Sequence, residues 1–163
     1  MQAGGTQQPS SQERELLGLA AACARRGDFE SAIVHLKRLL AADPRQEIAL
    51  GMLAGIYAEL KMADRAADLY RQVLAVNPRN PLARFQLGLL QFTDGRPREA
   101  VDTLHPALVD ESDFLAHLYS GLALRQLGLT GEARPLLEVA AQRMPVDHAL
   151  YPKLRELLEG PAS

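Results

Sequence analysis

The hexapeptide GDFESA at residues 27–32 has three counterparts along the chain, and this repetition decides the fold. The counterparts are KMADRA at 61–66, GRPREA at 95–100 and GLTGEA at 128–133. Each copy ends in alanine, and the four alanines (Ala32, Ala66, Ala100 and Ala133) are separated by 34, 34 and 33 residues. A period of this length indicates stacked supersecondary units, because one such unit alone cannot bury its apolar face.

Each period has the pattern of two helices joined by a short turn. Apolar residues on both sides of the hexapeptide follow a helical spacing, and Asp43-Pro44 and Asn77-Pro78 are typical of helix ends. Small residues recur in the first helices, and we expect them to pack closely against the four alanines of the second helices. The small residues are Ala20, Ala54, Gly88 and Gly121.

The composition favours an all-α protein. Leucine, alanine, arginine and glutamate, which are good helix formers, are abundant, whereas aromatic residues make up only 5% and tryptophan is absent. The net charge of −2 gives no overall basic surface, so we expect no nucleic-acid partner.

No apolar run reaches the roughly 18 to 20 residues needed to span a bilayer. Residues 1–10 also lack the basic and apolar regions of a secretory signal. We therefore expect a cytoplasmic protein, or a periplasmic or exported one if the chain is an excised piece of a longer protein.

The sequence carries no recognisable catalytic or cofactor motif. It contains no phosphate-binding glycine loop, no His-Glu-x-x-His metal motif and no nucleophile elbow. The single cysteine, Cys23, is interpreted as a buried thiol. The histidines show no ligand spacing and are interpreted as surface or half-buried packing residues; they are His35, His105, His117 and His148. We expect no enzymatic activity, no cofactor and no metal.

These repeats resemble the tetratricopeptide repeat (TPR) family. The small-residue, turn, alanine and closing-proline positions of that family are recognisable in four units, at 13–46, 47–80, 81–113 and 114–147. The resemblance implies a right-handed superhelical array of antiparallel helix hairpins. The usual leading tryptophan is replaced, by Leu16, Leu50, Arg84 and His117.

The expected organisation is one TPR domain over residues 12–160 behind a disordered tail over 1–11. Helical order should begin at Ser10, because Ser10 and Glu13 form the pattern of a capping box. A capping helix over 148–159 should follow the fourth unit, with Leu154 and Leu157 on its apolar side.

The third unit departs from the pattern at Pro106. A proline there removes a backbone hydrogen bond and clashes with the preceding helical turn. One interpretation is that the helix stops near His105 and an altered loop follows; the other is a bend or hinge between the third and fourth units.

In this family the first helices line a concave face that binds extended peptides or helices. The resemblance therefore implies a partner-binding groove in this chain. Gly51 and Gly55 are costly inside a helix, which suggests close approach of a partner, although glycine could also let neighbouring helices pack tightly. The predicted groove residues are Leu17, Ala21, Ala24, Gly51, Gly55, Ala58, Phe85, Leu89, Phe92, Leu118, Leu122 and Arg125.

The positions at which related co-chaperones grip an acidic C-terminus carry residues such as Leu17, Ala21 and Met52, so we expect an apolar ligand instead. The leading hypothesis is a scaffold, chaperone or adaptor that binds a peptide or helix of another protein. The alternatives are a docking segment of a larger enzyme, such as a glycosyltransferase or sulfotransferase, and a module that forms homodimers through the same face.

Overall fold

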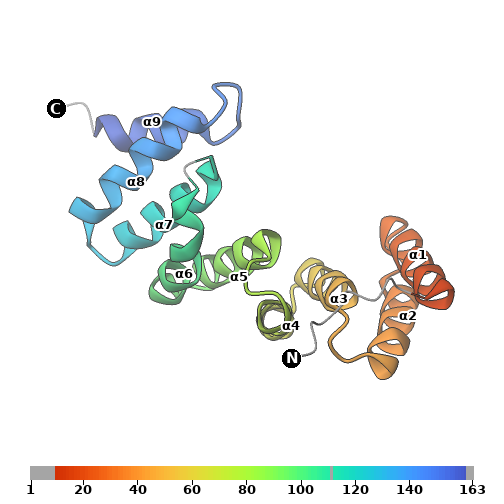
Figure 1. The fold of residues 1–163 in the computed structure, drawn as a ribbon. Coiled ribbons are helices and arrows are strands. Elements are labelled where there is room, and N and C mark those ends of the chain that lie inside the picture. The colour runs from red at the N-terminus through yellow and green to blue at the C-terminus, as the bar shows by residue number, and fades with distance from the viewer. Residues whose placement is uncertain (1–9, 111, 161–163) are drawn as a thin grey trace. The chain divides into compact units, whose positions relative to one another are not determined.

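The computed structural model describes residues 10–110 and 112–160, and within these ranges it contains helices and no strand (Figure 1). This confirms the prediction of an all-α protein. The chain divides into two compact units, one ending at Pro78 and the other beginning at Arg79. The single domain expected over 12–160 stays a prediction. Most of the expected tail at 1–11 lies outside the described residues, but Ser11 is already helical.

The first unit consists of two helix hairpins. Helices α1 (Ser11–Arg25) and α2 (Phe29–Ala42) form one hairpin, and α3 (Glu47–Glu59) and α4 (Ala63–Val76) form the other. Ser10 caps α1 through the predicted capping box with Glu13. Gly27 takes a φ of 77° in the first turn, a left-handed conformation that glycine adopts without steric cost.

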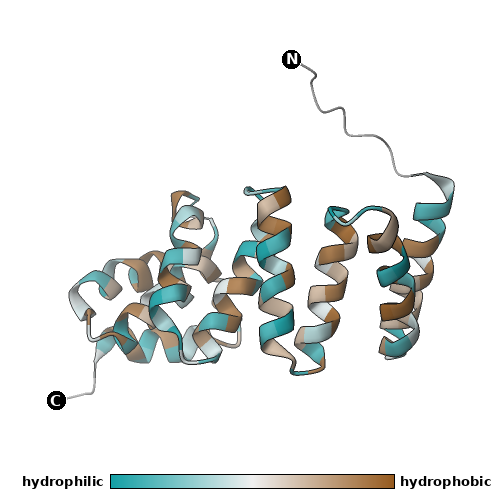
Figure 2. Cartoon of the chain, turned by 90° about the horizontal axis from the view of Figure 1, so that it is seen from below, coloured by the Kyte–Doolittle hydropathy of each residue, from teal (hydrophilic) through white to brown (hydrophobic). Residues whose placement is uncertain are grey.

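The second unit repeats this arrangement and adds a final helix. Helix α5 (Pro81–Thr93) pairs with α6 (Pro97–Leu104), and α7 (Phe114–Gln126) pairs with α8 (Thr130–Arg143). Helix α9 (Tyr151–Glu159) packs on α8 and corresponds to the capping helix expected over 148–159. Apolar and polar residues alternate around most of these helices, as Figure 2 shows.

The four repeated alanines lie in the second helix of each hairpin. Ala32, Ala66, Ala100 and Ala133 all have 0% of their surface exposed. In the second unit the two helices of each hairpin approach each other closely. A Cβ atom added to Gly88 would stand 2.5 Å from Cγ of Leu104, and one added to Gly121 would stand 2.7 Å from Cγ of Leu137. Of the four alanines, Ala133 takes part in this approach, with its carbonyl oxygen 3.2 Å from a Cβ added to Gly121. For the other three, close packing against the first helix stays a prediction.

The region around Pro106 shows the shortened helix. Helix α6 ends at Leu104, and the segment η1 (His105–Val109) continues as a 3₁₀ helix with Pro106 in its first turn. This agrees with the interpretation that the α-helix stops near His105.

A second proline, Pro135, lies inside α8 without ending it. Pro135 has no N–H to donate to the carbonyl of Gly131, four residues earlier, so that carbonyl receives no helical hydrogen bond from it. Both residues are exposed, and water can take the place of the missing donor. The helix therefore continues through a residue that usually breaks helices.

Candidate interaction face

The predicted site residues of the first unit lie on α1 and α3, and all of them are partly exposed. Each therefore offers some surface to a partner. They are Leu17, Ala21 and Ala24 on α1, and Gly51, Gly55 and Ala58 on α3.

The two glycines of α3 have free space beside them. A Cβ atom on Gly51 would meet no atom within 4 Å, and one on Gly55 would meet only the hydroxyl of Tyr70, at 3.8 Å. Tight packing between helices therefore does not explain glycine at these positions.

Burial, and secondarily the charge of Glu59, raises the pKa of the Tyr70 phenol, so this hydroxyl stays protonated at neutral pH.

Replacing Gly51 with alanine is expected to stabilise the protein by about 0.5–1 kcal/mol, because alanine loses less conformational entropy than glycine inside a helix. Chemical unfolding of the wild type and the variant measures the change. A loss of stability would contradict the open surroundings of Gly51 and would show that another group packs against it.

In the second unit, the face formed by α5 and α7 contains an aromatic cluster. The ring of Tyr119 lies edge-on to Phe85 and to Phe92, with centroid separations of 5.8 and 5.5 Å. All three side chains are partly exposed, as are Leu89 and Leu122. Edge-to-face pairs of this kind stabilise a fixed ring arrangement. We call these five residues the aromatic face; they are Phe85, Leu89, Phe92, Tyr119 and Leu122.

Sequence reasoning missed Tyr119 and named Leu118 in its place. Leu118 is only 3% exposed and belongs to a core cluster with Leu137, Met144 and Leu154, so it offers no surface to a partner. Successive residues of a helix differ by about 100° in direction, and α8 and α9 cover the side of α7 that carries Leu118. Tyr119 follows the period of Leu115 and Leu122, which could have identified it.

Arg125 ends the predicted set at the last turn of α7. Its side chain is exposed, and Nη1 donates a hydrogen bond to the carbonyl of Leu157 at 3.4 Å. Arg125 follows Leu122 by three residues, so a cation lies at the edge of the aromatic face.

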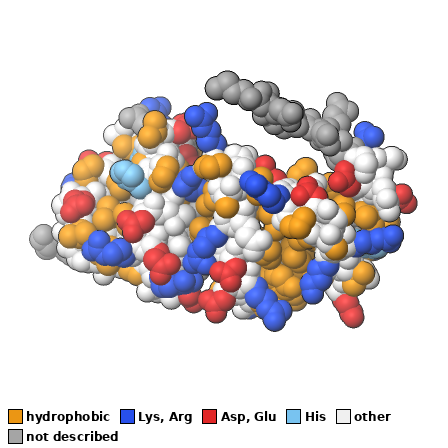
Figure 3. Space-filling model, turned by 60° about the horizontal axis from the view of Figure 1, so that its bottom comes forward, with side chains coloured by type: hydrophobic (Ala, Val, Ile, Leu, Met, Phe, Trp, Pro, Cys, Tyr) orange, Lys and Arg blue, Asp and Glu red, His pale blue; other side chains and the backbone are white. Residues whose placement is uncertain are grey.

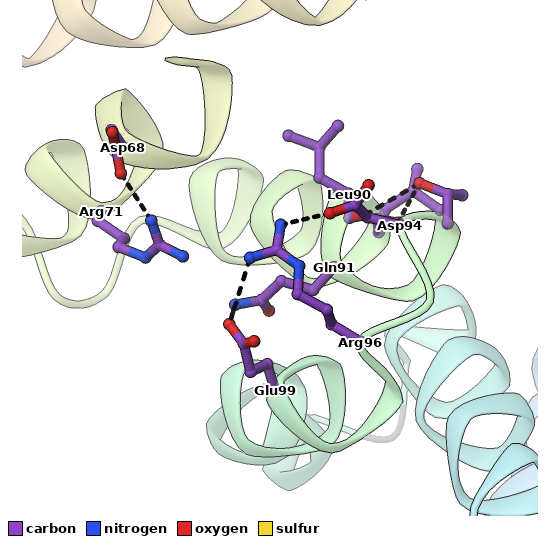
Figure 4. A network of polar contacts seen from close by, with 9 residues as sticks. Asp68, Arg71, Leu90, Gln91, Asp94, Arg96 and Glu99 are labelled. Atoms are coloured by element: carbon purple, nitrogen blue, oxygen red, sulfur yellow. Dashed lines mark hydrogen bonds and ion pairs between the residues drawn. The ribbon is translucent and has the colours of Figure 1, made fainter. Parts of the chain in front are cut away.

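The turn between α5 and α6 is fixed by polar contacts, which Figure 4 shows from close by. Arg96 forms ion pairs with Asp94 at 2.9 Å and with Glu99 at 3.6 Å. Gln91, which is 3% exposed, donates from Nε2 to Glu99 at 3.4 Å. These contacts hold the end of α5, and with it Phe92, in place.

No group of three or more metal-binding side chains occurs among the described residues. His117 was expected at the surface or half-buried but is 3% exposed, and its Nδ1 lies 2.9 Å from the carbonyl oxygen of Asp113. The ring of His148 packs edge-on against Phe114. Cys23 is buried, as predicted. These residues therefore serve packing.

Apolar side chains are exposed between charged ones on the surface of the molecule, as Figure 3 shows for one side. Within residues 10–110 and 112–160, no helix has the length and hydropathy that a membrane span requires.

Two family models match the chain, and both describe the tetratricopeptide repeat. One matches residues 13–56 and the other residues 58–124. The comparison with curated proteins found no match.

Solved structures of TPR proteins have the same fold. A point mutant of MamA is 27% identical, with a TM-score of 0.72 over 81% of this chain and 77% of that one. MamA from Desulfovibrio magneticus RS-1 is 19% identical, with a TM-score of 0.81 over 91% of this chain and 82% of that one. YrrB, described as a TPR protein with an unusual peptide-binding site, is 20% identical, with a TM-score of 0.74 over 81% of this chain and 69% of that one.

Proposed function

The chain belongs to the tetratricopeptide repeat family, whose members generally serve as protein-interaction modules, and from this premise we propose that it binds an apolar segment of another protein. The role would be that of a scaffold, adaptor or chaperone without enzymatic activity. The partner segment would be a peptide or a helix lying on the first helices of the hairpins.

The observation that carries this proposal is the aromatic face of the second unit. Phe85, Phe92 and Tyr119 hold one another in fixed orientations while part of each ring remains exposed. Rigid, partly exposed aromatic side chains supply large contact areas at low entropic cost and are enriched among the residues that dominate binding energy. Leu89 and Leu122 extend the face, which matches the apolar stripe of an amphipathic helix.

The experiment is a selection from a displayed peptide library, followed by affinity measurement with the purified chain. We expect enriched peptides with apolar residues at helical spacing. Leu89→Glu should weaken their binding at least tenfold, because a carboxylate in the centre of the contact would be desolvated without a partner.

The matched control is Val109→Glu. Val109 is 90% exposed in the η1 segment, so the same change of charge should leave both binding and folding intact. Circular dichroism must show that both variants remain helical. If folded Leu89→Glu binds the selected peptides as tightly as the wild type, the aromatic face is not the binding site.

A further inference from the structure

A second feature lies in the same unit as the aromatic face, at the C-terminal end of α7. It is a cavity of about 290 Å³ between the end of α7, the first half of α8 and the last turn of α9. Leu137, Leu157 and Leu158 contribute apolar lining, and Arg125 and Arg134 contribute cations. We call this the anchor cavity. Its volume is just below that of pockets that hold small ligands, about 300–1,000 Å³, and suits single amino-acid side chains.

The residues that line the cavity carry charge of one sign, since Arg125 and Arg134 are their charged members and no aspartate or glutamate is among them. Helices α5 and α7 contain no aspartate or glutamate, and their charged residues are Arg84 and Arg125. The glutamates of α8 and α9 lie outside the lining; they are Glu132, Glu138, Glu156 and Glu159. Nη1 of Arg84 donates to the carbonyl of Thr103 at 3.2 Å, whereas Arg125 lies at the cavity. A partner that enters the cavity therefore meets two cations and no carboxylate among the lining residues.

The second cation can turn toward a ligand at small cost. Nε of Arg134 donates to Glu138 at 2.9 Å, but this pair is solvent-exposed, with 66% of the arginine side chain accessible. Exposed ion pairs between neighbouring turns of a helix are weak. A carboxylate held between Arg125 and Arg134 would therefore compete well with Glu138.

The cavity is also lined by backbone. Gly131 lines it, and a glycine can do so only with its backbone. The carbonyl of Gly131 lacks its usual helical donor because residue 135 is proline. A peptide N–H is the complementary group. The lining thus presents apolar surface, cations and a backbone acceptor together.

We propose that the anchor cavity binds an aliphatic side chain that is followed directly by an acidic residue within a partner's chain. The aliphatic group packs on Leu157 and Leu158, above the buried Leu137, and the carboxylate pairs with Arg125 and Arg134. An N–H of the same segment donates to the carbonyl of Gly131. This inference rests on the proposed function, because it gives the apolar partner segment an acidic neighbour that sets its position on the aromatic face.

The test uses two capped dipeptides as probes, acetyl-Leu-Asp-amide and its neutral isostere acetyl-Leu-Asn-amide. Each is titrated into the isotopically labelled full chain and followed by NMR. We expect the methyl signals of Leu157 and Leu158 to shift, with the aspartate peptide binding about threefold or more tightly than the asparagine peptide. Arg125→Gln should remove this preference.

Arg98→Gln is the control, since Arg98 is an exposed arginine of α6 outside the cavity, and it should keep the preference. Equal binding of the two dipeptides, or shifts confined to other residues, would overturn the proposal. Tighter binding of acetyl-leucine with a free carboxylate would overturn the assignment to an internal segment and indicate a C-terminus. Leu89→Glu should leave dipeptide binding unchanged, so a failure of this proposal is distinct from a failure of the aromatic face.

Discussion

Leu137→Ala is expected to destabilise the second unit by about 2–5 kcal/mol, the usual range for removing a buried leucine side chain beyond its Cβ. Leu137 is 2% exposed, packs over Gly121 and joins the core cluster that contains Leu118, Met144 and Leu154. The substitution would leave a cavity where α7, α8 and α9 meet. Since leucine and alanine both favour helices, the loss would come from packing and not from helix propensity.

Urea unfolding followed by circular dichroism measures this loss, and hydrogen exchange shows whether it falls on α7–α9. The control is Leu82→Ala in the same unit, where the side chain is 65% exposed and the expected change is within about 0.5 kcal/mol. Equal effects of the two substitutions would mean that Leu137 is not the centre of this core.

The repeated pattern made most of the fold predictable. The same residue type recurs at the same place in each hairpin, and it is fully buried there every time. The four residues are Ala32, Ala66, Ala100 and Ala133. The capping box at Ser10 was recognisable for a similar reason, since both of its hydrogen bonds link residues three positions apart. Local constraints of this kind need no knowledge of the tertiary structure.

The candidate site was less predictable, because adjacent apolar residues of a helix differ only in the direction in which their side chains point. Leu118 and Tyr119 both fit a helical pattern, and both contact the core formed with α8 and α9, but Leu118 is 3% exposed whereas Tyr119 stays partly exposed. Pro135 shows the same limit. Sequence rules predict that proline ends a helix, but the freed carbonyl of Gly131 lies where water can reach it, and α8 continues. The anchor cavity includes the second of these details, since Gly131 is among its lining residues.

Gly121→Ala is expected to cost about 1–3 kcal/mol, although alanine is the better helix former. The added Cβ would stand 2.7 Å from Cγ and Cδ2 of Leu137 and 3.2 Å from the carbonyl oxygen of Ala133. The leucine can rotate only within a filled core, and the carbonyl belongs to the backbone of α8. The two helices would have to separate.

Combining Gly121→Ala with Leu137→Ala tests this explanation directly. If the new methyl group clashes with the leucine, the double variant should lose less stability than the sum of the two single losses, because alanine at 137 leaves room for it. Ala54 at the matching position of the first unit shows that the fold accepts a methyl group where the opposing side chain permits it. Gly51→Ala is expected to change the stability in the opposite direction, because a Cβ atom at position 51 has free space around it. Additive losses, or a gain of stability from Gly121→Ala alone, would contradict this explanation. Either result would show that Leu137 leaves room for a methyl group at position 121.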